Sequence, residues 1–581
     1  MLNVDPCGEL NILEQLRVSG VLMESPCNGK GMCGKCKVRV INGEASALTE
    51  REITCLTAEE ISKGVRLACQ AVPKEPLLLD PLGLLEEQEG RVLGSSRIPD
   101  VVFAPAVTAK LTEVGTPDLE NGWTLCDSLG DVLKGIKQIP LSLMRKLPGL
   151  MGLRSLWSIC YDGIPVDLRK DSQRYGLAVD IGTTTVALVL VDLSSGEVLG
   201  EDGFINPQKA FGLDVLSRIH YDIEHSDGVK DLQNAIVRHL QNGAGKMAAR
   251  AGIPIDAIYE IVVGGNSTML HALLGVPLQS LGISPYSSVF TQPMTVSARE
   301  LGFDLNPEGK VYCIPAVSTY IGGDIVAGVL VSRIDEAQDT VLLVDIGTNG
   351  EIVLSRQGRM YACSCAAGPA LEGMNISCGM RAEDGAVERV VLGNGHVTLG
   401  VIGGGTPRGL CGSGLLEAVS QAATTGLINK SGRISADSLF TDIDEKGKRR
   451  IVLDRKHGIY LTQNDIRQVQ FCKGAILSGI LTLLDRLSLE PQDIDRVIVA
   501  GQFGKHLEPE SLTGAGLIPA VLRDRISYVG NSSMAGAQMC LLSMDERKRA
   551  EHIAQNIEYI ELSVSDGYEK RFTRCLQLGG T

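Results

Sequence analysis

The stretch "YGLAVDIGTTTVALVLVDLSSGEVLGEDGFI" occupies residues 175–205, and "TVLLVDIGTNGEIVLSRQGRMYACSC" occupies residues 340–365. Each begins with an apolar run ending in Asp-Ile-Gly-Thr and continues as two further strand-like runs joined by turns. A pattern that recurs within one chain indicates an internal duplication. The sequence therefore predicts a large domain over 174–581, built from two related halves that each open with three consecutive strands.

The two Asp-Ile-Gly-Thr turns are candidates for phosphate binding. Backbone N–H groups and hydroxyls on the concave side of such a turn can hold a phosphate. An Asp at the strand end can hold Mg²⁺ through water, because Mg²⁺ prefers oxygen ligands and retains several waters. Asp-Ile-Gly also occurs in ordinary hairpins, but we expect these turns to face each other across a cleft and clamp ATP. The residues concerned are Asp180, Gly182, Thr183 and Thr184 in the first turn and Asp345, Gly347, Thr348 and Asn349 in the second.

Three further residues are predicted to lie at the nucleotide site. In "DRVIVAGQFGKHL" (495–507) an apolar strand ends in Gly501 and Gly504, where backbone could approach an adenosine closely. In "STYIGGD" (318–324) the carboxylate of Asp324 stands beside two glycines. We assign Asp180 and Asp345 as the catalytic residues, and no further base for ATP hydrolysis can be assigned.

A second chemical centre is indicated by "CNGKGMCGKC" at 27–36. Iron–sulfur clusters are held by four thiolates, and plant-type ferredoxins use C-x4-C-x2-C with a distant fourth Cys. Here the first gap is one residue longer, and "RLACQ", expected on a later strand, supplies the fourth thiol. The predicted ligands are Cys27, Cys33, Cys36 and Cys69, with Cys55 competing for the fourth position.

The glycines of the loop support an iron–sulfur cluster, and two other uses of the same thiols are a zinc site and a redox dithiol. Gly29, Gly31 and Gly34 would let the loop curl so that amide N–H groups point at sulfur. Zinc could use the same thiolates, although zinc sites more often contain paired C-x2-C units. A redox dithiol at Cys33 and Cys36 would leave the other two thiols unexplained.

The N-terminal part of the chain divides into small segments. Residues 1–85 predict an α+β domain in which "ELNILEQLRVSG" and "LTAEEISKG" are helices and "CKVRVING" and "VRLACQAVP" are strands. Thr57 and Glu60 form a predicted capping box. Residues 86–100 read as a linker and 101–173 as a small middle domain. In that domain "PLSLMRKLPGLMGLRSLW" (140–157) predicts a packed helix rather than a membrane-surface segment, because Pro148 interrupts the pattern.

Composition restricts the classes of partner. The formal charge of −14 and pI of about 5.2 argue against nucleic acid as a partner. No leader-like start and no membrane-spanning apolar run are visible, so we expect a cytoplasmic protein without a membrane partner. Its 16 cysteines are then expected to be reduced thiols, mostly buried singly, rather than disulfides.

These motifs carry resemblances to known families. "CNGKGMCGKCKVRV…RLACQ" resembles a 2Fe–2S ferredoxin of the adrenodoxin-like branch, and the duplicated turns resemble the superfamily of acetate and sugar kinases, chaperone ATPases and actin. Over nearly the whole chain, including "GGNST" and "GNSSMAGA", the sequence resembles the ATP-dependent reductive activators of corrinoid-dependent enzymes. Some archaeal relatives carry a C-terminal domain with two 4Fe–4S clusters. This sequence has only the single Cys575 in that region and so resembles the bacterial type of the family.

The resemblance implies a fold and a function. The fold class would be multidomain α+β and α/β: a β-grasp ferredoxin domain, a middle domain and a duplicated actin-like (RNase H-like) ATPase domain. The cofactors would be a 2Fe–2S cluster, ATP and Mg²⁺. The implied reaction is transfer of one electron to Co(II) of a corrinoid protein in a methyltransferase system, which regenerates Co(I). A ferredoxin or flavodoxin would be the low-potential electron donor, and a homodimer is expected.

Two other function classes fit the same motifs. One is a small-molecule kinase whose ferredoxin domain senses redox state. The other is a chaperone-like ATPase that assembles a cofactor without net electron transfer. Fold alone does not separate these classes, because members of the superfamily phosphorylate, chaperone or polymerise.

Overall fold

A computed structural model describes residues 1–8, 10–19, 21, 23, 25, 29–82, 98–115, 120, 124–127, 129, 139–150, 152–393, 395–435, 438–445, 447–501 and 507–578. The chain forms two compact units. Unit 1 comprises Met1–Val92 and Phe103–Cys313, and unit 2 comprises Leu93–Val102 and Ile314–Thr581. The predicted ATPase region therefore contributes one half to each unit. Most of the predicted linker 86–100 lies outside the described residues.

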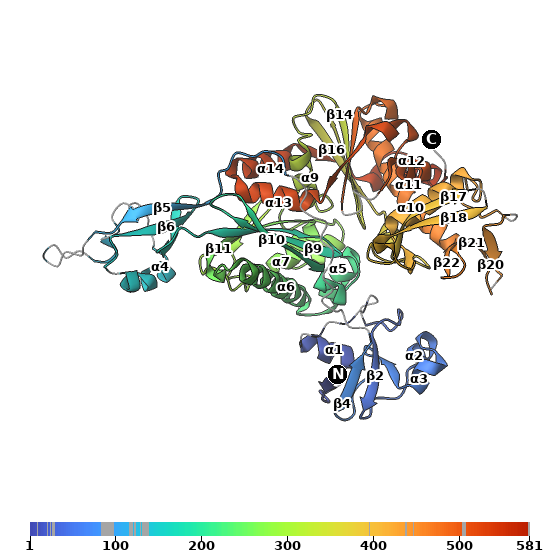
Figure 1. Cartoon of the computed structure of the whole chain (residues 1–581), viewed down its shortest axis with the longest axis horizontal. Helices are drawn as coiled ribbons and strands as arrows, with labels where there is room; N and C mark the ends of the chain where they lie inside the picture. The colour runs from blue at the N-terminus through green and yellow to red at the C-terminus, as the bar shows by residue number, and fades with distance from the viewer. Residues whose placement is uncertain are drawn as a thin grey trace. The chain divides into compact units, whose positions relative to one another are not determined.

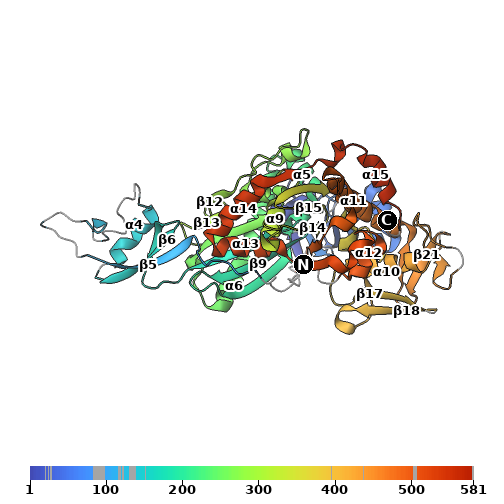
Figure 2. The same cartoon turned by 90° about the horizontal axis from the view of Figure 1, so that it is seen from above.

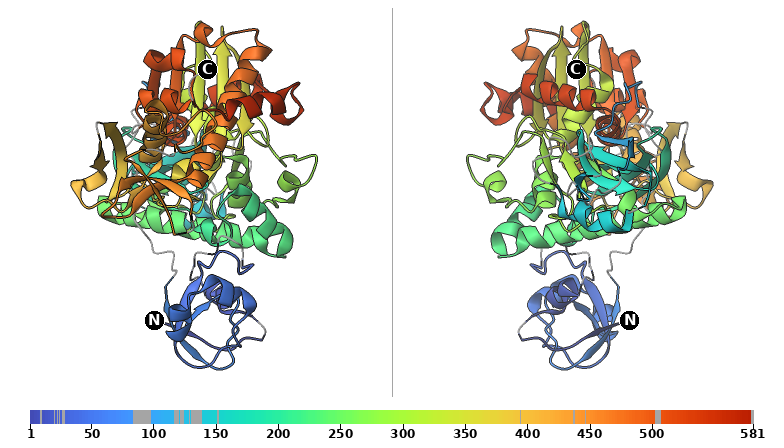
Figure 3. Two further views of the ribbon diagram at one scale, coloured as in Figure 1. Left: turned by 90° about the vertical axis from the view of Figure 1, so that its right-hand side faces the viewer. Right: turned by 90° about the vertical axis from the view of Figure 1, so that its left-hand side faces the viewer.

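The N-terminal domain (1–82) is a four-stranded antiparallel sheet with short helices, drawn in blue in Figure 3. The strand order is β1-β4-β2-β3. The predicted capping box is confirmed, since Thr57 N–H donates to Glu60 Oε2 at 2.9 Å and Glu60 N–H donates to Thr57 Oγ1 at 3.2 Å. The elements are β1 (Leu2–Val4), α1 (Ile12–Val18), β2 (Lys37–Asn42), α2 (Glu50–Cys55), α3 (Ala58–Ser62), β3 (Val65–Leu67) and β4 (Leu77–Pro81).

One strand of this domain is shorter than predicted. We expected 65–73 to be a strand carrying Cys69, but β3 ends at Leu67 and Cys69 lies in the turn that follows. The Ala68 N–H donates to the carbonyl of Cys36 at 2.7 Å, and the Gln70 N–H bonds the Leu67 carbonyl at 2.9 Å. The chain therefore turns at this point, so that Cys69 follows a bend against Cys36.

The segment 101–173 contains a three-stranded antiparallel sheet in the order β5-β6-β7. The predicted helix over 140–157 is only partly correct. A short helix packs Leu143 and Leu147 into the core of this segment, but the C-terminal part of the stretch becomes a strand. Pro148 lacks an N–H and cannot continue an α-helix. The elements are β5 (Val107–Glu113), α4 (Leu141–Lys146), η2 (Leu147–Leu150), β6 (Ser155–Tyr161) and β7 (Ile164–Arg169).

The rest of unit 1 is a six-stranded sheet in the order β10-β9-β8-β11-β13-β12. The three predicted consecutive strands are confirmed as the antiparallel run β8, β9 and β10, and β11 lies parallel to β8. The long helix α6 packs against β9 and β10, and Figure 2 shows it beside β9. The elements are β8 (Tyr175–Ile181), β9 (Thr185–Asp192), β10 (Val198–Ile205), η3 (Pro207–Ala210), α5 (Val215–Glu224), α6 (Gly228–Ala251), η4 (Ile255–Ala257), β11 (Ile258–Gly265), α7 (Ser267–Leu274), α8 (Gln279–Gly282), β12 (Met294–Ser297) and β13 (Lys310–Cys313).

Unit 2 repeats this arrangement around the order β24-β23-β14-β15-β16-β25. Strands β14, β15 and β16 form the antiparallel run, and β23 lies parallel to β14 as β11 does to β8. The predicted duplication is therefore confirmed. The elements of the repeat are α9 (Gly323–Ser332), β14 (Thr340–Ile346), β15 (Gly350–Arg356), β16 (Arg359–Cys365), α11 (Gln463–Arg486), β23 (Arg496–Ala500), β24 (Ile526–Gly530), α13 (Ser532–Leu542), α14 (Met544–Asn556) and β25 (Ile557–Tyr559).

Helices α9 and α13 pack against each other, and the remaining elements of unit 2 include two small sheets (Figure 1). Two small three-stranded sheets have the orders β18-β17-β19 and β20-β21-β22. The elements are η5 (Pro369–Glu372), β17 (Ala386–Gly393), β18 (His396–Val401), η6 (Ile402–Gly404), β19 (Gly409–Leu410), α10 (Gly412–Thr424), β20 (Thr441–Ile443), β21 (Arg449–Asp454), β22 (Ile459–Thr462), η7 (Pro491–Asp493), α12 (Pro509–Ala515), η9 (Ala520–Arg525), η10 (Leu562–Val564) and α15 (Tyr568–Cys575).

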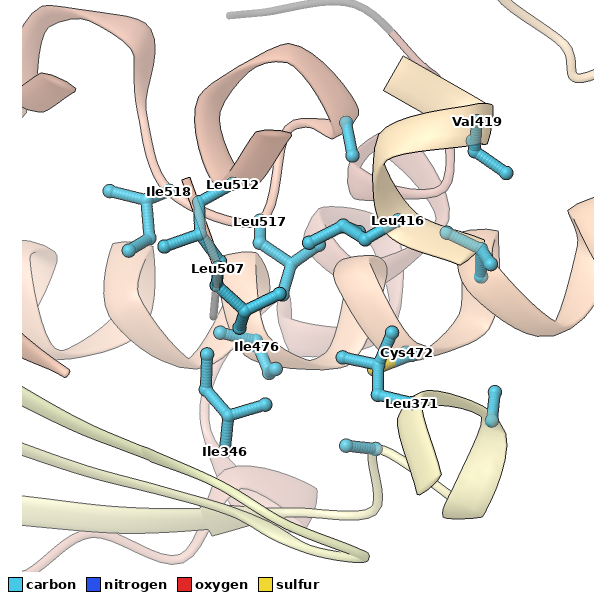
Figure 4. Packing of buried hydrophobic residues seen from close by; sticks show 14 of the residues in the cluster. Ile346, Leu371, Leu416, Val419, Cys472, Ile476, Leu507, Leu512, Leu517 and Ile518 are labelled. Atoms are coloured by element: carbon cyan, nitrogen blue, oxygen red, sulfur yellow. The ribbon is translucent and has the colours of Figure 1, made fainter. Parts of the chain in front are cut away.

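The core of unit 2 fixes the strand that leads to the second turn. Ile346 is buried and points toward Ile476 of α11 and toward Leu507 (Figure 4). Successive side chains of a strand point to opposite faces, so Asp345 points away from this core. None of the cysteines that the structure describes forms a disulfide. Within the described residues, the helices that are long enough to cross a bilayer are too polar to do so.

Candidate functional site

The first turn (180–184) joins β8 to β9 in unit 1. Ile181 is fully buried, so alternation along β8 puts the half-buried Asp180 on the opposite face. Gly264 of β11 pairs with Asp180, which keeps the neighbouring strand free of a side chain at this position. A Cβ atom at Gly182 would lie 2.7 Å from the carbonyl oxygen of Thr185. The turn is therefore too tight for any residue but glycine at that position.

Three side chains from later segments brace this turn. Asn206 donates from Nδ2 to the Gly182 carbonyl at 2.8 Å, and its N–H donates to the Thr184 carbonyl at 2.9 Å. Arg218, with no exposed surface, donates to the carbonyl of Thr183. Asn266 donates to Thr183 Oγ1 at 3.1 Å and also caps α7. These contacts fix the turn through its carbonyl groups and the Thr183 hydroxyl. A turn of this kind can bind an anion through its backbone N–H groups.

The second turn (345–349) joins β14 to β15 in unit 2. The Gly347 N–H donates to the Asn349 carbonyl at 3.0 Å, and Thr348 Oγ1 bonds Glu372. Gly501 follows β23 with φ +99°, and a Cβ there would lie 2.9 Å from Asp345 Oδ1. Only glycine fits this position without displacing the carboxylate, so the structure brings Gly501 and Asp345 together as adjacent strand ends.

Two further carboxyl groups lie near Asp345. Glu351 is its direct cross-strand partner on β15, and Asp324 stands in the first turn of α9. The residue Glu351 is half-buried, but its carboxyl lies deep among protein atoms. This burial, together with the charges of Asp324 and Asp345, raises the pKa of Glu351 well above its ordinary value. A divalent cation would offset this repulsion.

This carboxyl arrangement fits Mg²⁺ held indirectly. Among the described residues no three acidic, His or Cys side chains are close enough to hold an ion together. Mg²⁺ in nucleotide sites keeps several waters and takes one or two carboxylates besides the phosphates. The carboxyl groups around Asp345 therefore offer the oxygen ligands that Mg²⁺ prefers.

The described part of the cysteine loop (29–36) leads into the core of the N-terminal domain, where Cys36 is buried. Cys36 and Cys69 are both buried in the same core cluster, and Cys69 acts directly on the Cys36 thiol. The interaction with Cys69, then burial and the nearby Cys33, raise the pKa of the Cys36 thiol. Gly29, Gly31 and Gly34 all have positive φ, as a loop curled around a cluster needs. Cys27 lies outside the described residues.

Cys55 lies beside the loop but makes different contacts. Its Sγ approaches the carbonyl oxygens of Gly31 at 3.5 Å and Met32 at 3.8 Å. A thiol held against carbonyls is oriented as a donor to backbone, whereas Cys36 and Cys69 face each other. The geometry favours Cys69 over Cys55 as the fourth ligand, and this assignment stays a prediction.

A buried ion pair holds the segment that carries Cys69. The Glu52 carboxylate accepts from Arg66 Nε at 2.8 Å and from the Leu67 N–H at 3.0 Å, and it has no exposed surface. Burial alone would raise the pKa of Glu52, but Arg66 and the N–H groups of Thr49 and Leu67 hold it below the ordinary value. Glu52 therefore fixes the strand that ends two residues before the thiol.

Some predicted site residues are not tested by the geometry. Gly504 lies outside the described residues, as does Cys27. The two turns lie in separate units, so their facing across a cleft stays a prediction.

Sequence reasoning missed the residues that brace the first turn. Asn266 lies in the conspicuous "GGNST", and Asn206 precedes a proline, which is a turn signal. Arg218 gives no such signal, because a lone arginine in a helical stretch normally indicates a solvated face. Its role becomes visible only when α5 is packed against the turn.

Known families match the chain along most of its length. Residues 3–74 match the 2Fe-2S iron-sulfur cluster binding domain, and residues 175–337 match the RACo middle region. Residues 339–581 match the C-terminal domain of RACo, the ASKHA domain. The segment described there as the middle region is thus the first half of the region that we predicted as the ATPase.

Individual relatives extend these matches to the full chain. The corrinoid activation enzyme RamQ of Eubacterium limosum is 30% identical over 96% of this chain and 95% of its own length. The [Co(II) methylated amine-specific corrinoid protein] reductase of Methanosarcina barkeri is 23% identical over 68% of this chain and 75% of its own. A solved structure of a reductive activator for a corrinoid, iron-sulfur protein is 33% identical, covers 99% of this chain and 96% of its own, and superimposes with a TM-score of 0.74.

Proposed function

Because this chain belongs to the RACo-type family of reductive activators, we propose that it reduces the Co(II) form of a corrinoid protein of a methyltransferase system to Co(I) in an ATP-dependent reaction. One observation carries this proposal: a cluster-binding domain and a duplicated ATPase region occupy one chain, which matches a corrinoid activation enzyme over 96% of its length.

The electron balance of the proposed reaction is simple. When bound, the 2Fe–2S cluster supplies one electron, so that the cluster is oxidised as Co(II) of the partner is reduced to Co(I). Cys27, Cys33, Cys36 and Cys69 are the proposed ligands. The buried pair Glu52–Arg66 and the positive-φ glycines support Cys69 and the loop. Buried thiolates and inward-pointing amides set the charge around a cluster, and with it the reduction potential.

The role proposed for ATP is to change the protein's affinity for its partner. Docking of the corrinoid protein would alter the ligation of its cobalt and so raise the cobalt reduction potential. For a one-electron step, about 59 mV changes the equilibrium constant tenfold, so a small rise favours electron transfer strongly. Asp180 and Asp345 would orient Mg²⁺, and the two turns would hold the phosphates. A nucleotide shifts the equilibrium only if one conformation of the protein binds it more tightly than the other.

The further partners follow from the same proposal. The corrinoid belongs to the partner protein and is the substrate of the reaction. A low-potential ferredoxin or flavodoxin would re-reduce the cluster, and a homodimer is proposed from the family.

Anaerobic absorbance spectroscopy tests the proposal. The reduced protein is mixed with a Co(II) corrinoid protein, and Co(I) absorbance is followed with and without Mg-ATP. We expect Co(I) only with ATP and none with Cys33→Ala, because that variant loses a cluster ligand. Cys55→Ala is the matched control and should behave as the wild type.

Two results would contradict the proposal. Steady ATP turnover without Co(I), using several corrinoid proteins, would favour the kinase or the chaperone-like function. Co(I) formation at the same rate without ATP would remove the ATPase from the mechanism.

A further inference from the structure

The segment 206–212 lies directly against the first turn. Asn206 bonds the turn and also caps η3, because its Oδ1 accepts the N–H of Gln208 at 3.0 Å. Arg218 reaches the Thr183 carbonyl with one nitrogen and the Gly212 carbonyl with Nε at 3.0 Å. The backbone of 206–212 is therefore tied to the turn at both of its ends.

The same segment receives two side chains from the N-terminal domain. Arg17, in the last turn of α1, donates to the Ala210 carbonyl at 2.7 Å, and Ser25 Oγ donates to the same oxygen at 2.6 Å. Arg17 also donates to Ser25 Oγ at 2.8 Å. One backbone oxygen on the ATPase side is thus shared by two donors from the N-terminal domain.

Two aromatic rings also contact Arg17, and together with the Ala210 carbonyl and Ser25 they form its binding site. Its guanidinium lies 5.3 Å from the ring centroid of Phe211 and 5.4 Å from that of Tyr221 on α5. A cation over an aromatic face gains more when it is desolvated. Burial lowers the pKa of Arg17, although the nearby Tyr221 and Glu14 oppose that shift. Removing a guanidinium from water is unfavourable unless other groups compensate for the lost hydration. The carbonyl, the hydroxyl and the two rings provide that compensation for Arg17.

The contact stands close to the proposed cluster ligands. Ser25 precedes Cys27 by two residues and has only 1% of its surface exposed. Lys30, inside the cysteine loop, pairs with Glu224 of α5 at 3.3 Å. That pair is exposed and contributes little, but it lies on the same helix as Tyr221. The loop that would hold the cluster is therefore flanked by contacts to the segment that supports the first turn.

We propose that Arg17 and Ser25 dock the N-terminal domain on the segment 206–212, and that a nucleotide at the first turn strengthens this docking. A bound nucleotide would order the first turn, and the turn would then fix the side chains of Asn206 and Arg218 that contact it. Because these residues hold the segment 206–212, the Ala210 carbonyl would also be fixed in place. Binding free energies are reciprocal, so docking must tighten nucleotide binding by the same factor. The inference rests on the proposed nucleotide site but not on the identity of the electron acceptor.

The test compares Arg17→Ala with Lys63→Ala, a matched loss of one positive charge. Lys63 pairs with Glu59 at 2.6 Å in an exposed ion pair at the end of α3, away from the helix that carries Arg17. Nucleotide affinity is measured by calorimetry with Mg²⁺ and a non-hydrolysable ATP analogue, and hydrogen exchange is followed over 10–19 and 206–224. No corrinoid protein is present.

The expected result separates the two variants. In the wild type and Lys63→Ala, the nucleotide should slow exchange in both segments. In Arg17→Ala this slowing should vanish over 10–19, and the nucleotide Kd should rise about fivefold or more. An unchanged Kd with unchanged protection in Arg17→Ala would overturn the proposal, and so would faster exchange at 206–224 on nucleotide binding.

Two safeguards keep the result interpretable. Ser25→Ala removes a donor to the same carbonyl without removing a charge, and should weaken the coupling in the same direction. Retention of cluster absorbance reports whether each variant is folded. Failure to bind any nucleotide would overturn both this inference and the proposed function, whereas intact coupling without Co(I) formation would overturn only the proposed acceptor.

Discussion

At the scale of single residues, the two thiols Cys36 and Cys69 already meet in the core of the N-terminal domain. Sequence spacing predicted both as ligands, because the order of thiols along the chain reflects the four-thiolate requirement of a cluster. It favoured Cys69 over Cys55 by motif position alone, and it could not show which thiol turns inward. The chain bend after Leu67 and the carbonyl contacts of Cys55 supply the missing information.

Replacing these thiols tests the ligand assignment. Cys36→Ser and Cys69→Ser should each abolish the visible absorbance of the cluster, because a hydroxyl is a poor substitute for a thiolate. Cys55→Ser should retain it. Iron and sulfide contents of the purified variants check the result. Loss of iron in Cys55→Ser together with retention in Cys69→Ser would reverse the assignment, and zinc in place of iron would favour the zinc alternative.

Glu52→Gln tests the buried pair beneath Cys69. The variant leaves Arg66 partly buried without its carboxylate, so we expect local destabilisation of about 3 kcal/mol. Because the folded pKa of Glu52 is depressed, its stabilising effect is present above the pKa of unfolded Glu and is lost as pH falls through the folded value.

Hydrogen exchange over residues 64–71, followed from pH 7 to below the folded pKa of Glu52 and corrected for intrinsic rates, measures both effects. The wild type should lose protection as the pH falls, and Glu52→Gln should be less protected at pH 7 and less dependent on pH. Equal protection of the two proteins at pH 7 would contradict the structural role of this pair.

At the scale of elements, local sequence patterns determined the strands and a helix cap, whereas tertiary packing determined the length of one helix and the support of the first turn. The strand triplets and the capping box of α3 followed from apolar runs and short-range spacing. The helix predicted over 140–157 ended early, because Pro148 and the pairing of β6 with β5 override the apolar pattern. The bracing of the first turn by Asn206 and Arg218 could not be predicted, since both residues come from elements that follow the turn.

Two glycine substitutions separate a required turn from a tolerant helix. Gly182→Ala should weaken binding of magnesium nucleotide by at least about tenfold, because its Cβ would clash with the Thr185 carbonyl. Gly245→Ala in α6 meets nothing within 4 Å and should stabilise the helix by about 1 kcal/mol. Calorimetry of nucleotide binding and of thermal unfolding checks both. A Gly182→Ala protein with wild-type nucleotide affinity would remove the first turn from the site.

At the scale of the whole molecule, the duplication is the feature that sequence revealed most completely. Both sheets show the same antiparallel triplet with a parallel fourth strand, as the repeated apolar runs indicated. Each copy has an Asp one residue before the end of its first strand, on the face opposite the core. The predicted facing of the two turns depends on the arrangement of the two units and is therefore a matter for experiment.

Asparagine substitutions test whether both copies serve one reaction. Asp180→Asn and Asp345→Asn keep side-chain shape but remove the charge that would orient Mg²⁺. Each should lower ATP turnover and ATP-dependent Co(I) formation by at least about tenfold, with the cluster spectrum unchanged. Asp545→Asn, at an exposed ion pair, is the matched control. Loss of activity in only one of the two variants would assign nucleotide chemistry to that half alone.

The shared carbonyl of Ala210 has a consequence for sequence variation. Its oxygen belongs to the main chain, so no substitution at position 210 can delete it, although the full burial of Ala210 restricts the residue to a small one. The donors Arg17 and Ser25, by contrast, are side chains and can each be lost in a single step. Substitutions that remove this contact would therefore occur first on the N-terminal domain. The Ala210 carbonyl on the ATPase half would remain, so a later substitution that restored Arg17 would restore the contact.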